Sequence, residues 1–160
     1  MEDLQETPVD VEVTDGRVLV RAGGIVVIER IGDPAARKHV PIGTRDRRHL
    51  TMLVDGVPAV LRPRAGRYTR GSYKVRAIHD GAEYLLRPKD PETSRLHRDG
   101  FRLGDFKIVD GVVRVDWEPD ARITAKATDL AIGYALAAAF GTGANFFLVM
   151  LLDLLGHMPD

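Results

Sequence analysis

The C-terminal region contains a stretch of 22 residues, 131–152, without a formal charge. A continuous apolar helix of that length could cross a bilayer. The sequence GTGAN at 141–145 interrupts it with glycine and polar residues. Irregular backbone and polar groups are costly in the hydrocarbon layer. The chain must therefore either enclose this stretch in a folded core or place an interrupted span in a membrane, and we expect the first.

The capping signals divide the stretch into two helices. Thr128 is a suitable N-cap, Asp129 a suitable first-turn acid and Gly141 a suitable C′ residue, so the first helix is predicted over Asp129–Phe140. Twelve residues rise only about 18 Å, at about 1.5 Å each. A bilayer core is about 30 Å thick. Since this helix is apolar on every side, it has to be enclosed by other elements.

A second helix is predicted to begin at Thr142 or Gly143, and it also lacks a polar face. It could close the mouth of a barrel, touch lipid or form a contact between copies of the chain. The candidate residues for a homo-oligomer contact are Phe146, Phe147, Met150 and Leu151. In the competing interpretation both helices form one tail anchor, with Arg122 and Lys126 on the cytoplasmic side.

Turn signals recur through the rest of the chain. They stand at Asp15-Gly16, Gly23-Gly24, Asp55-Gly56, Asp80-Gly81, Asp99-Gly100 and Asp110-Gly111. Such pairs, flanked by β-forming residues, are typical of tight hairpins. We therefore expect a mainly β fold, an antiparallel meander of about 10–11 short strands. A change in alternation at Gly104-Asp105 predicts a β-bulge, and bends of that kind help a sheet to close into a barrel.

We expect one domain, with an acidic flexible N-terminus at 1–10, antiparallel β structure at 11–127 and a hydrophobic helical C-terminus at 128–158. The charges balance at 23 Lys+Arg and 23 Asp+Glu, which makes nucleic acid an unlikely partner. There are no cysteines, and the acidic N-terminus has no features of a signal peptide. We expect a cytoplasmic protein, with membrane association as the alternative.

A basic segment is the best candidate for a ligand surface. It carries no acid, and its candidate anion-binding residues are Arg62, Arg64, Arg67, Tyr68, Arg70, Lys74 and Arg76. Arginine forks suit phosphate, and an aromatic ring can rest at a lipid interface. Arg45, Arg47 and Arg48 could join this set if the loops 31–49 and 62–72 fold together. The alternative is a solvated loop and edge strand whose charges prevent aggregation.

Catalytic and metal-binding signals are weak. The five histidines have no metal-ligand spacing, so we expect neither a metal nor another cofactor. Ser94, His97 and Asp99 lie near one another in sequence, but side chains on a strand alternate between faces and do not converge. We predict no catalytic residues.

The chain resembles the Tubby C-terminal and LURP-one superfamily, to which the scramblases are related. The best matching pieces are GDFKIVDGVVRV and TDLAIGYALAAAF, within 11–140. The resemblance implies a closed barrel of about twelve strands around a central hydrophobic helix. It also implies lipid or phosphoinositide binding, or scaffolding, without a defined reaction.

These observations lead to one main expectation and two alternatives. We expect a non-enzymatic binding or scaffold domain whose basic loops meet an anionic partner such as a lipid headgroup or membrane surface. The first alternative is a β domain tethered to a membrane by its C-terminus. The second is an enzyme of a type that short motifs do not reveal, because a site can assemble from distant loops.

Overall fold

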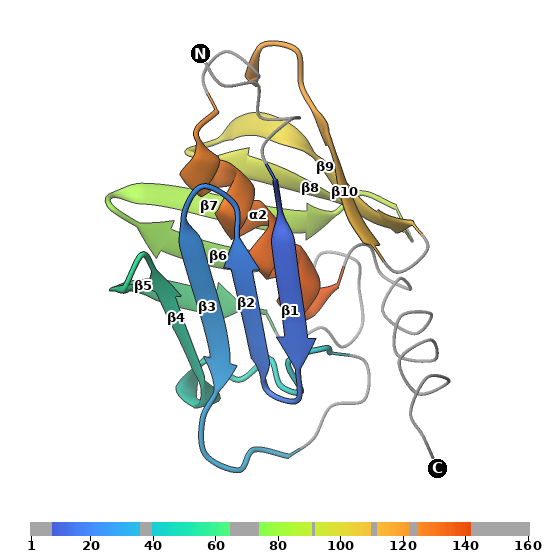
Figure 1. The fold of residues 1–160 in the computed structure, drawn as a ribbon. Coiled ribbons are helices and arrows are strands. Elements are labelled where there is room, and N and C mark those ends of the chain that lie inside the picture. Colours follow the sequence, from blue (N-terminus) through green and yellow to red (C-terminus); the bar gives the residue numbers. More distant parts are fainter. Residues whose placement is uncertain are drawn as a thin grey trace.

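A computed structural model describes residues 8–35, 40–64, 74–90, 92–109, 112–121 and 125–141. Within them the chain forms ten strands, one short 3-10 helix and one α-helix (Figure 1). The elements are β1 (Asp10–Thr14), β2 (Arg17–Arg21), β3 (Ile25–Arg30), η1 (Arg47–His49), β4 (Leu50–Val54), β5 (Val57–Pro63), β6 (Val75–His79), β7 (Ala82–Pro88), β8 (Thr93–Arg98), β9 (Phe101–Val109), β10 (Val112–Trp117) and α2 (Ala127–Phe140).

All ten strands lie in one sheet in sequence order, and every neighbour is antiparallel. The predicted mainly β meander is confirmed. Its hairpins depend on local turn chemistry. Asp55, Asp80 and Asp99 have φ near 50° and each precedes a glycine with positive φ, which is the geometry of a type I′ turn. The turn at 110–111 lies outside the described residues.

The predicted irregularity in β9 is present one residue earlier than expected. Leu96 pairs with Gly104 and His97 pairs with Arg102, so Leu103 is an extra residue in β9. Both Leu103 and Gly104 are buried, which is how the strand changes the phase of its alternation. Gly104 is required here because a Cβ would lie 2.7 Å from the carbonyl oxygen of Asp116.

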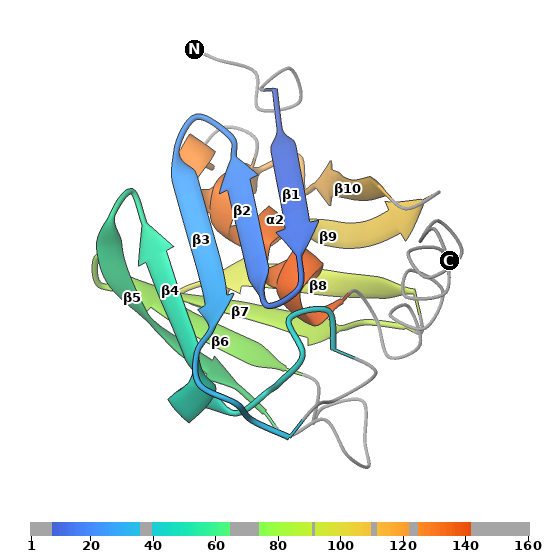
Figure 2. The same cartoon turned by 60° about the horizontal axis from the view of Figure 1, so that its bottom comes forward.

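The predicted closed barrel is wrong. The sheet order ends at β1 and at β10, and no ladder joins these two edges in the described part of the chain. Both edge strands instead contact α2. Closure needs a strand pair about 4.8 Å apart, and a bulge that bends one strand does not supply that pair. The molecule is therefore a strongly curved open sheet with a helix inside (Figures 1 and 2).

The position of α2 shows how far the sheet curls. Ten strands laid flat would span about 43 Å, at about 4.8 Å between neighbours, whereas a helix with its side chains is about 10 Å wide. Yet α2 contacts β1, β2 and β3 as well as β7, β9 and β10. The two ends of the sheet must therefore approach opposite sides of the same helix, as the two views show.

The expectation that this hydrophobic helix packs as core is confirmed. Eleven of the 14 residues of α2 are buried, including Leu130, Ile132 and Leu136. The many small side chains of this helix allow close packing. At Gly133 a Cβ would lie 2.4 Å from Cζ of Phe106, so only glycine admits that ring against the helix.

The helix starts two residues earlier than predicted. Lys126, rather than Thr128, is the N-cap, and the Asp129 carboxylate accepts a hydrogen bond from the Lys126 backbone N–H at 2.8 Å. An acid at N3 that reaches back to the N-cap supplies half of a capping box, so no N-cap hydroxyl is needed. The predicted end is confirmed, because Gly141 follows the last turn with φ of 87°.

Asp129 also fastens α2 to the sheet. Its side chain is 1% exposed and accepts hydrogen bonds from the Tyr84 hydroxyl of β7, at 2.5 Å, and from the Arg98 guanidinium of β8. Burial, followed by the hydrogen bond to Asp129, raises the pKa of Tyr84. The one buried carboxylate of the described residues is thus fully paired, as burial of a charge requires.

The connection between β3 and β4 is irregular, as predicted, but part of it belongs to the core. Val40 and Ile42 are buried, and the Ile42 N–H donates to the Ala139 carbonyl of α2 at 3.0 Å. Arg30 holds the same segment through a hydrogen bond of 3.0 Å to the Ile42 carbonyl. This connection therefore closes the sheet interior beneath the C-terminal end of α2.

The rest of the uncharged stretch, 142–152, and the residues after it to 160 lie outside the described residues. The predicted second helix and the candidate contact residues Phe146, Phe147, Met150 and Leu151 fall there, and so do Arg122 and the acidic 1–7. Among the described residues, no helix has the length and apolar character needed to cross a membrane. The segment 130–140, which the tail-anchor alternative places in a bilayer, is instead buried against the sheet.

Candidate functional site

The convex outer face of β5–β10 carries most of the charge of this half of the sheet. Leu61, Val75, Tyr84, Leu96 and Phe106 point inward and are buried. The alternate positions point outward, and their cationic members are Arg62, Arg76, Arg87, Arg95, Arg102, Lys107 and Arg114. The acidic members are fewer, namely Glu83, Asp105 and Asp116. We call this set of outward-facing residues the basic surface.

Three pairs of cations lie directly opposite each other on neighbouring strands of the basic surface. These pairs are Arg62 with Arg76, Arg87 with Arg95, and Lys107 with Arg114. Side chains in such positions have Cβ atoms about 4.5–5.5 Å apart, and like charges there destabilise the sheet. The repulsion within such a pair is offset either by an acid of the sheet or by a bound anionic group.

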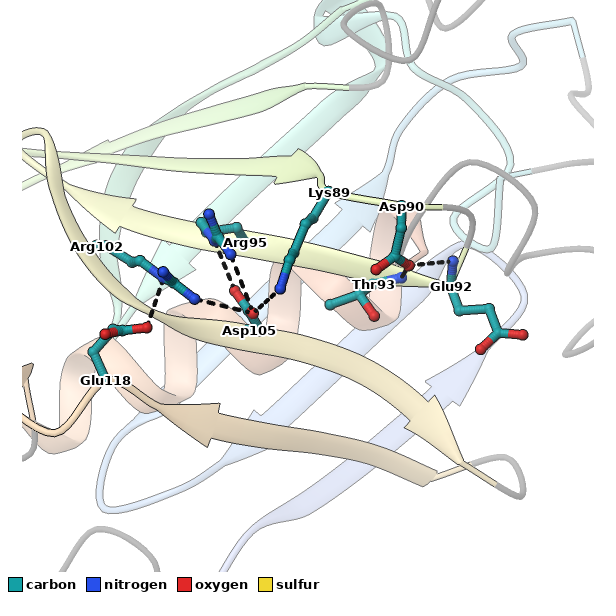
Figure 3. Close-up of polar contacts among 8 residues, drawn as sticks. All are labelled: Lys89, Asp90, Glu92, Thr93, Arg95, Arg102, Asp105 and Glu118. Carbon is teal, nitrogen blue, oxygen red and sulfur yellow. Dashed lines mark hydrogen bonds and ion pairs between the residues drawn. The ribbon is translucent and has the colours of Figure 1, made fainter.

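Two of the pairs have an acidic partner within the sheet. Arg76 forms an ion pair of 2.6 Å with Glu83. Arg95 donates to Asp105 at 2.9 Å, and Lys89 and Arg102 reach the same carboxylate at 3.0 and 3.4 Å (Figure 3). Arg102 also meets Glu118 at 2.7 Å. Asp105 is therefore the centre of a compact charge network.

The network fixes the ionisation of Asp105. Burial alone would raise the pKa of this carboxyl, but hydrogen bonds from Arg95 and Lys89, and the positive charges of both, outweigh burial and lower it. Asp105 is thus ionised and already engaged by three cations, and it is not available as a general acid.

The third pair has no acidic partner among the described residues. Neither Lys107 nor Arg114 has a carboxylate within ion-pair distance there. Both side chains line a hollow of about 460 Å³. The other lining residues are Lys89, Thr93, Asp105, Val115 and Asp116. Lys107 and Arg114, which have no ion-pair partner among the described residues, are groups that can hold a phosphate or carboxylate there, whereas Lys89 is already paired with Asp105.

A second hollow, of about 320 Å³, lies over β7 and β8 and is lined by Arg87, His97 and Glu83, among others. Burial lowers the pKa of His97, and the charges of Arg87, Arg95 and Arg102 lower it further. His97 is therefore neutral at neutral pH.

The structure describes four of the seven residues that the sequence predicts for the ligand surface. Arg62 and Arg76 face each other on the basic surface, and both are exposed. Arg64 and Lys74 stand at the two ends of the β5–β6 connection, joined by a backbone hydrogen bond of 2.9 Å. Arg67, Tyr68 and Arg70 lie outside the described residues, and their role stays a prediction.

Arg45 meets the β5–β6 connection but cannot bind a ligand there. It is 5% exposed, its Nε donates to the Arg64 carbonyl at 2.5 Å, and Nη2 donates to the Lys74 carbonyl at 3.3 Å. Its guanidinium also lies 5.4 Å from the centre of the Phe140 ring, a cation–π contact. The two connections do come together, and Arg45 is the structural link between them.

The other two arginines of that connection differ in availability. Arg48 is paired with Asp46 at 2.8 Å, and its hydrogen bonds lower the pKa of Asp46 to about 2. Arg47 is exposed on η1.

Sequence reasoning missed Arg87, Arg95, Lys107 and Arg114, which lie beyond the most basic segment. A signal for one pair was present. A two-residue turn at Asp110-Gly111 places Val109 opposite Val112, and counting back along both strands sets Lys107 opposite Arg114. The pair Arg87 and Arg95 is joined by a longer connection, whose register no turn rule fixes.

The triad and metal arrangements considered from the sequence are not assembled among the described residues. No group of three or more His, Asp or Glu side chains among them is placed to hold a metal ion. Ser94 is 2% exposed and faces the core, whereas His97 faces outward.

No family model, curated protein or solved structure matches this chain. The resemblance to the Tubby C-terminal and LURP-one superfamily therefore stays a prediction, and the open sheet differs from the closed barrel that it implies.

Proposed function

We propose that this chain is a non-enzymatic binding domain whose basic surface holds an anionic lipid headgroup. The observation that carries the proposal is the pair Lys107 and Arg114, which lie directly opposite each other on β9 and β10 and have no ion-pair partner among the described residues. The pair presents donors side by side, which suits the adjacent oxygens of a phosphate. The pair Lys107 and Arg114, beside the larger hollow, is the proposed centre of the surface.

Exposed apolar side chains favour a lipid over a small soluble anion. Val112 is 56% exposed on the same strand face as Arg114, and Val60 is 46% exposed two residues before Arg62. Apolar residues beside cations are typical of proteins that rest on an anionic membrane, where the apolar group enters the interface. A cation near such a membrane contributes about 1 kcal/mol.

The test compares two doubly neutralised forms of the full chain. One carries Lys107→Gln and Arg114→Gln. The control carries Arg17→Gln and Arg21→Gln, which remove the same charge from β2, where both arginines pair with acids. Co-sedimentation is measured with vesicles of phosphatidylcholine, with and without phosphatidylserine. We expect the first variant to lose about 2 kcal/mol, roughly 30-fold in affinity, and the control to bind like the unmodified chain.

Three results would count against the proposal. Equal losses in both variants would mean that net charge, rather than the basic surface, attracts the vesicles. Binding that ignores phosphatidylserine or added salt would exclude an electrostatic headgroup site. If inorganic phosphate raises the melting temperature through Lys107 and Arg114 while vesicles do not bind, the ligand is a soluble phosphate rather than a lipid.

A further inference from the structure

The larger hollow of the outer face lies over two neighbouring cross-strand rows of the sheet. In the first row Thr93, Lys107 and Arg114 follow one another across β8, β9 and β10. All three line the hollow. This row supplies a hydroxyl and the two cations that we propose hold the phosphate.

The second row brings acids to the same hollow. Asp105 of β9 lies directly opposite Asp116 of β10, and both line the hollow. Asp105 is already engaged by Arg95 at 2.9 Å and by Lys89 at 3.0 Å (Figure 3). Asp116 is exposed and forms no ion pair with another described residue. The hollow therefore contains one carboxylate whose charge the described part of the sheet does not neutralise.

Asp116 and the cation pair stand close together without being joined. Asp116 follows Arg114 by two residues on the same face of β10, about 6.7 Å along the strand. None of the ion pairs among the described residues joins Asp116 to Arg114 or Lys107. An anion held by the two cations would lie beside this carboxylate, and the two negative charges would repel each other. A ligand that also carries a positive charge would remove that repulsion.

We propose that the ligand of this hollow is a phosphate ester with a primary ammonium group, as in the headgroups of phosphatidylserine and phosphatidylethanolamine. Its phosphate binds Lys107 and Arg114, and its ammonium donates to the Asp116 carboxylate. A neutral hydroxyl could also donate to a carboxylate, but a charged donor forms a hydrogen bond roughly twice as strong. This inference rests on the proposed function and adds to it which headgroup the basic surface selects.

The test compares two lipids of equal net charge. Phosphatidylserine and phosphatidylglycerol each carry a single net negative charge, and only phosphatidylserine has an ammonium group. Co-sedimentation of the full chain is measured with phosphatidylcholine vesicles that contain the same fraction of one lipid or the other. EDTA is present, so that no metal ion bridges Asp116 to a phosphate. We expect the vesicles with phosphatidylserine to bind about fivefold more tightly.

Three variants assign that preference to Asp116. Asp116→Asn should remove it, because the amide keeps the shape of the side chain and loses its charge, whereas Asp116→Glu should retain it. The matched control is Asp33→Asn, which removes one negative charge from an exposed position in the β3–β4 connection and should leave the preference unchanged. Both positions are exposed, so the fold should tolerate all three changes. A preference for phosphatidylserine that survives Asp116→Asn would overturn the inference.

Two further results separate this inference from the proposed function. If the unmodified chain binds both lipids equally and the binding still needs Lys107 and Arg114, the inference is wrong and the proposed function stands. Melting temperatures with glycerophosphoserine and with glycerophosphoglycerol test the soluble headgroups. If no vesicle binds but glycerophosphoserine stabilises the chain more, through Asp116, the inference holds for a soluble phosphate ester and the lipid is wrong. Absence of both responses overturns the inference and the proposed function together.

Discussion

The residue that joins the two layers of this molecule is Asp129. It belongs to the first turn of α2, yet it accepts hydrogen bonds from side chains of β7 and β8 and from the backbone that precedes the helix. A buried carboxylate without such partners would be strongly disfavoured. Tyr84 and Arg98 thus fix where along the sheet the helix begins.

Asp129→Ala should lower the free energy of unfolding by about 3–5 kcal/mol, because it leaves the Arg98 guanidinium partly buried without its partner. Asp116→Ala is the matched control, since Asp116 is exposed and forms no ion pair among the described residues. The control should change stability by less than about 0.5 kcal/mol. Urea unfolding of both variants measures this, and similar values would mean that Asp129 does not fasten the helix.

Asp105 should make stability depend on acid pH. Its pKa in the folded chain lies below the ordinary value, so its contribution is fully present above the unfolded pKa of about 3.9 and is lost as pH falls through the folded pKa. The unmodified chain should therefore exceed Asp105→Asn by about 1–2 kcal/mol at pH 7.

The check for Asp105 is a pair of urea titrations between pH 2 and pH 7. The difference between the two chains should be constant above about pH 5 and should shrink below about pH 4. A difference that is independent of pH would show that the carboxylate charge contributes nothing.

At this scale, the sequence predicts which residues are basic but not which are exposed. Arg45 and Arg76 look alike in the sequence, yet Arg45 is buried on backbone carbonyls and Arg76 is exposed beside Arg62. Burial of an arginine depends on which carbonyls the fold brings to it. That information arises only from the pairing of distant strands.

At the scale of the elements, the turns were predictable and the long connections were not. Asp-Gly pairs fix positive φ locally, so hairpins such as β4–β5 and β6–β7 follow from the sequence alone. The sequence predicts a start at Asp129 because the Thr128 hydroxyl is a usual N-cap, whereas in the structure Asp129 caps α2 from inside its first turn.

The β3–β4 connection allows a test with the same residue type in two environments. Ile42 is 0% exposed and Ile31 is 44% exposed, although both lie in the irregular segment between the strands. Ile42→Ala should cost about 2–5 kcal/mol. Ile31→Ala should cost less than about 0.5 kcal/mol. If thermal unfolding shows equal effects, this connection is not part of the core.

At the scale of the whole molecule, the sequence predicts a helix enclosed by antiparallel strands but not the open edge. Hydrophobic alternation indicates which side of each strand faces inward. It does not indicate whether the first and last strands meet, because closure depends on tilt and stagger summed over the entire sheet. The geometry of the assembled sheet also brings Lys107, Arg114 and Lys89 around one hollow.

The central claim is that α2 is the core around which the sheet curls. Circular dichroism with thermal melting of three forms tests it most directly: the full chain, a form ending at Gly143 and a form ending at Lys126. We predict cooperative melting for the first two and none for the form ending at Lys126, since the inner faces of β2, β3, β7 and β9 would lose the helix they contact. A cooperative transition in the form that lacks α2 would contradict the account.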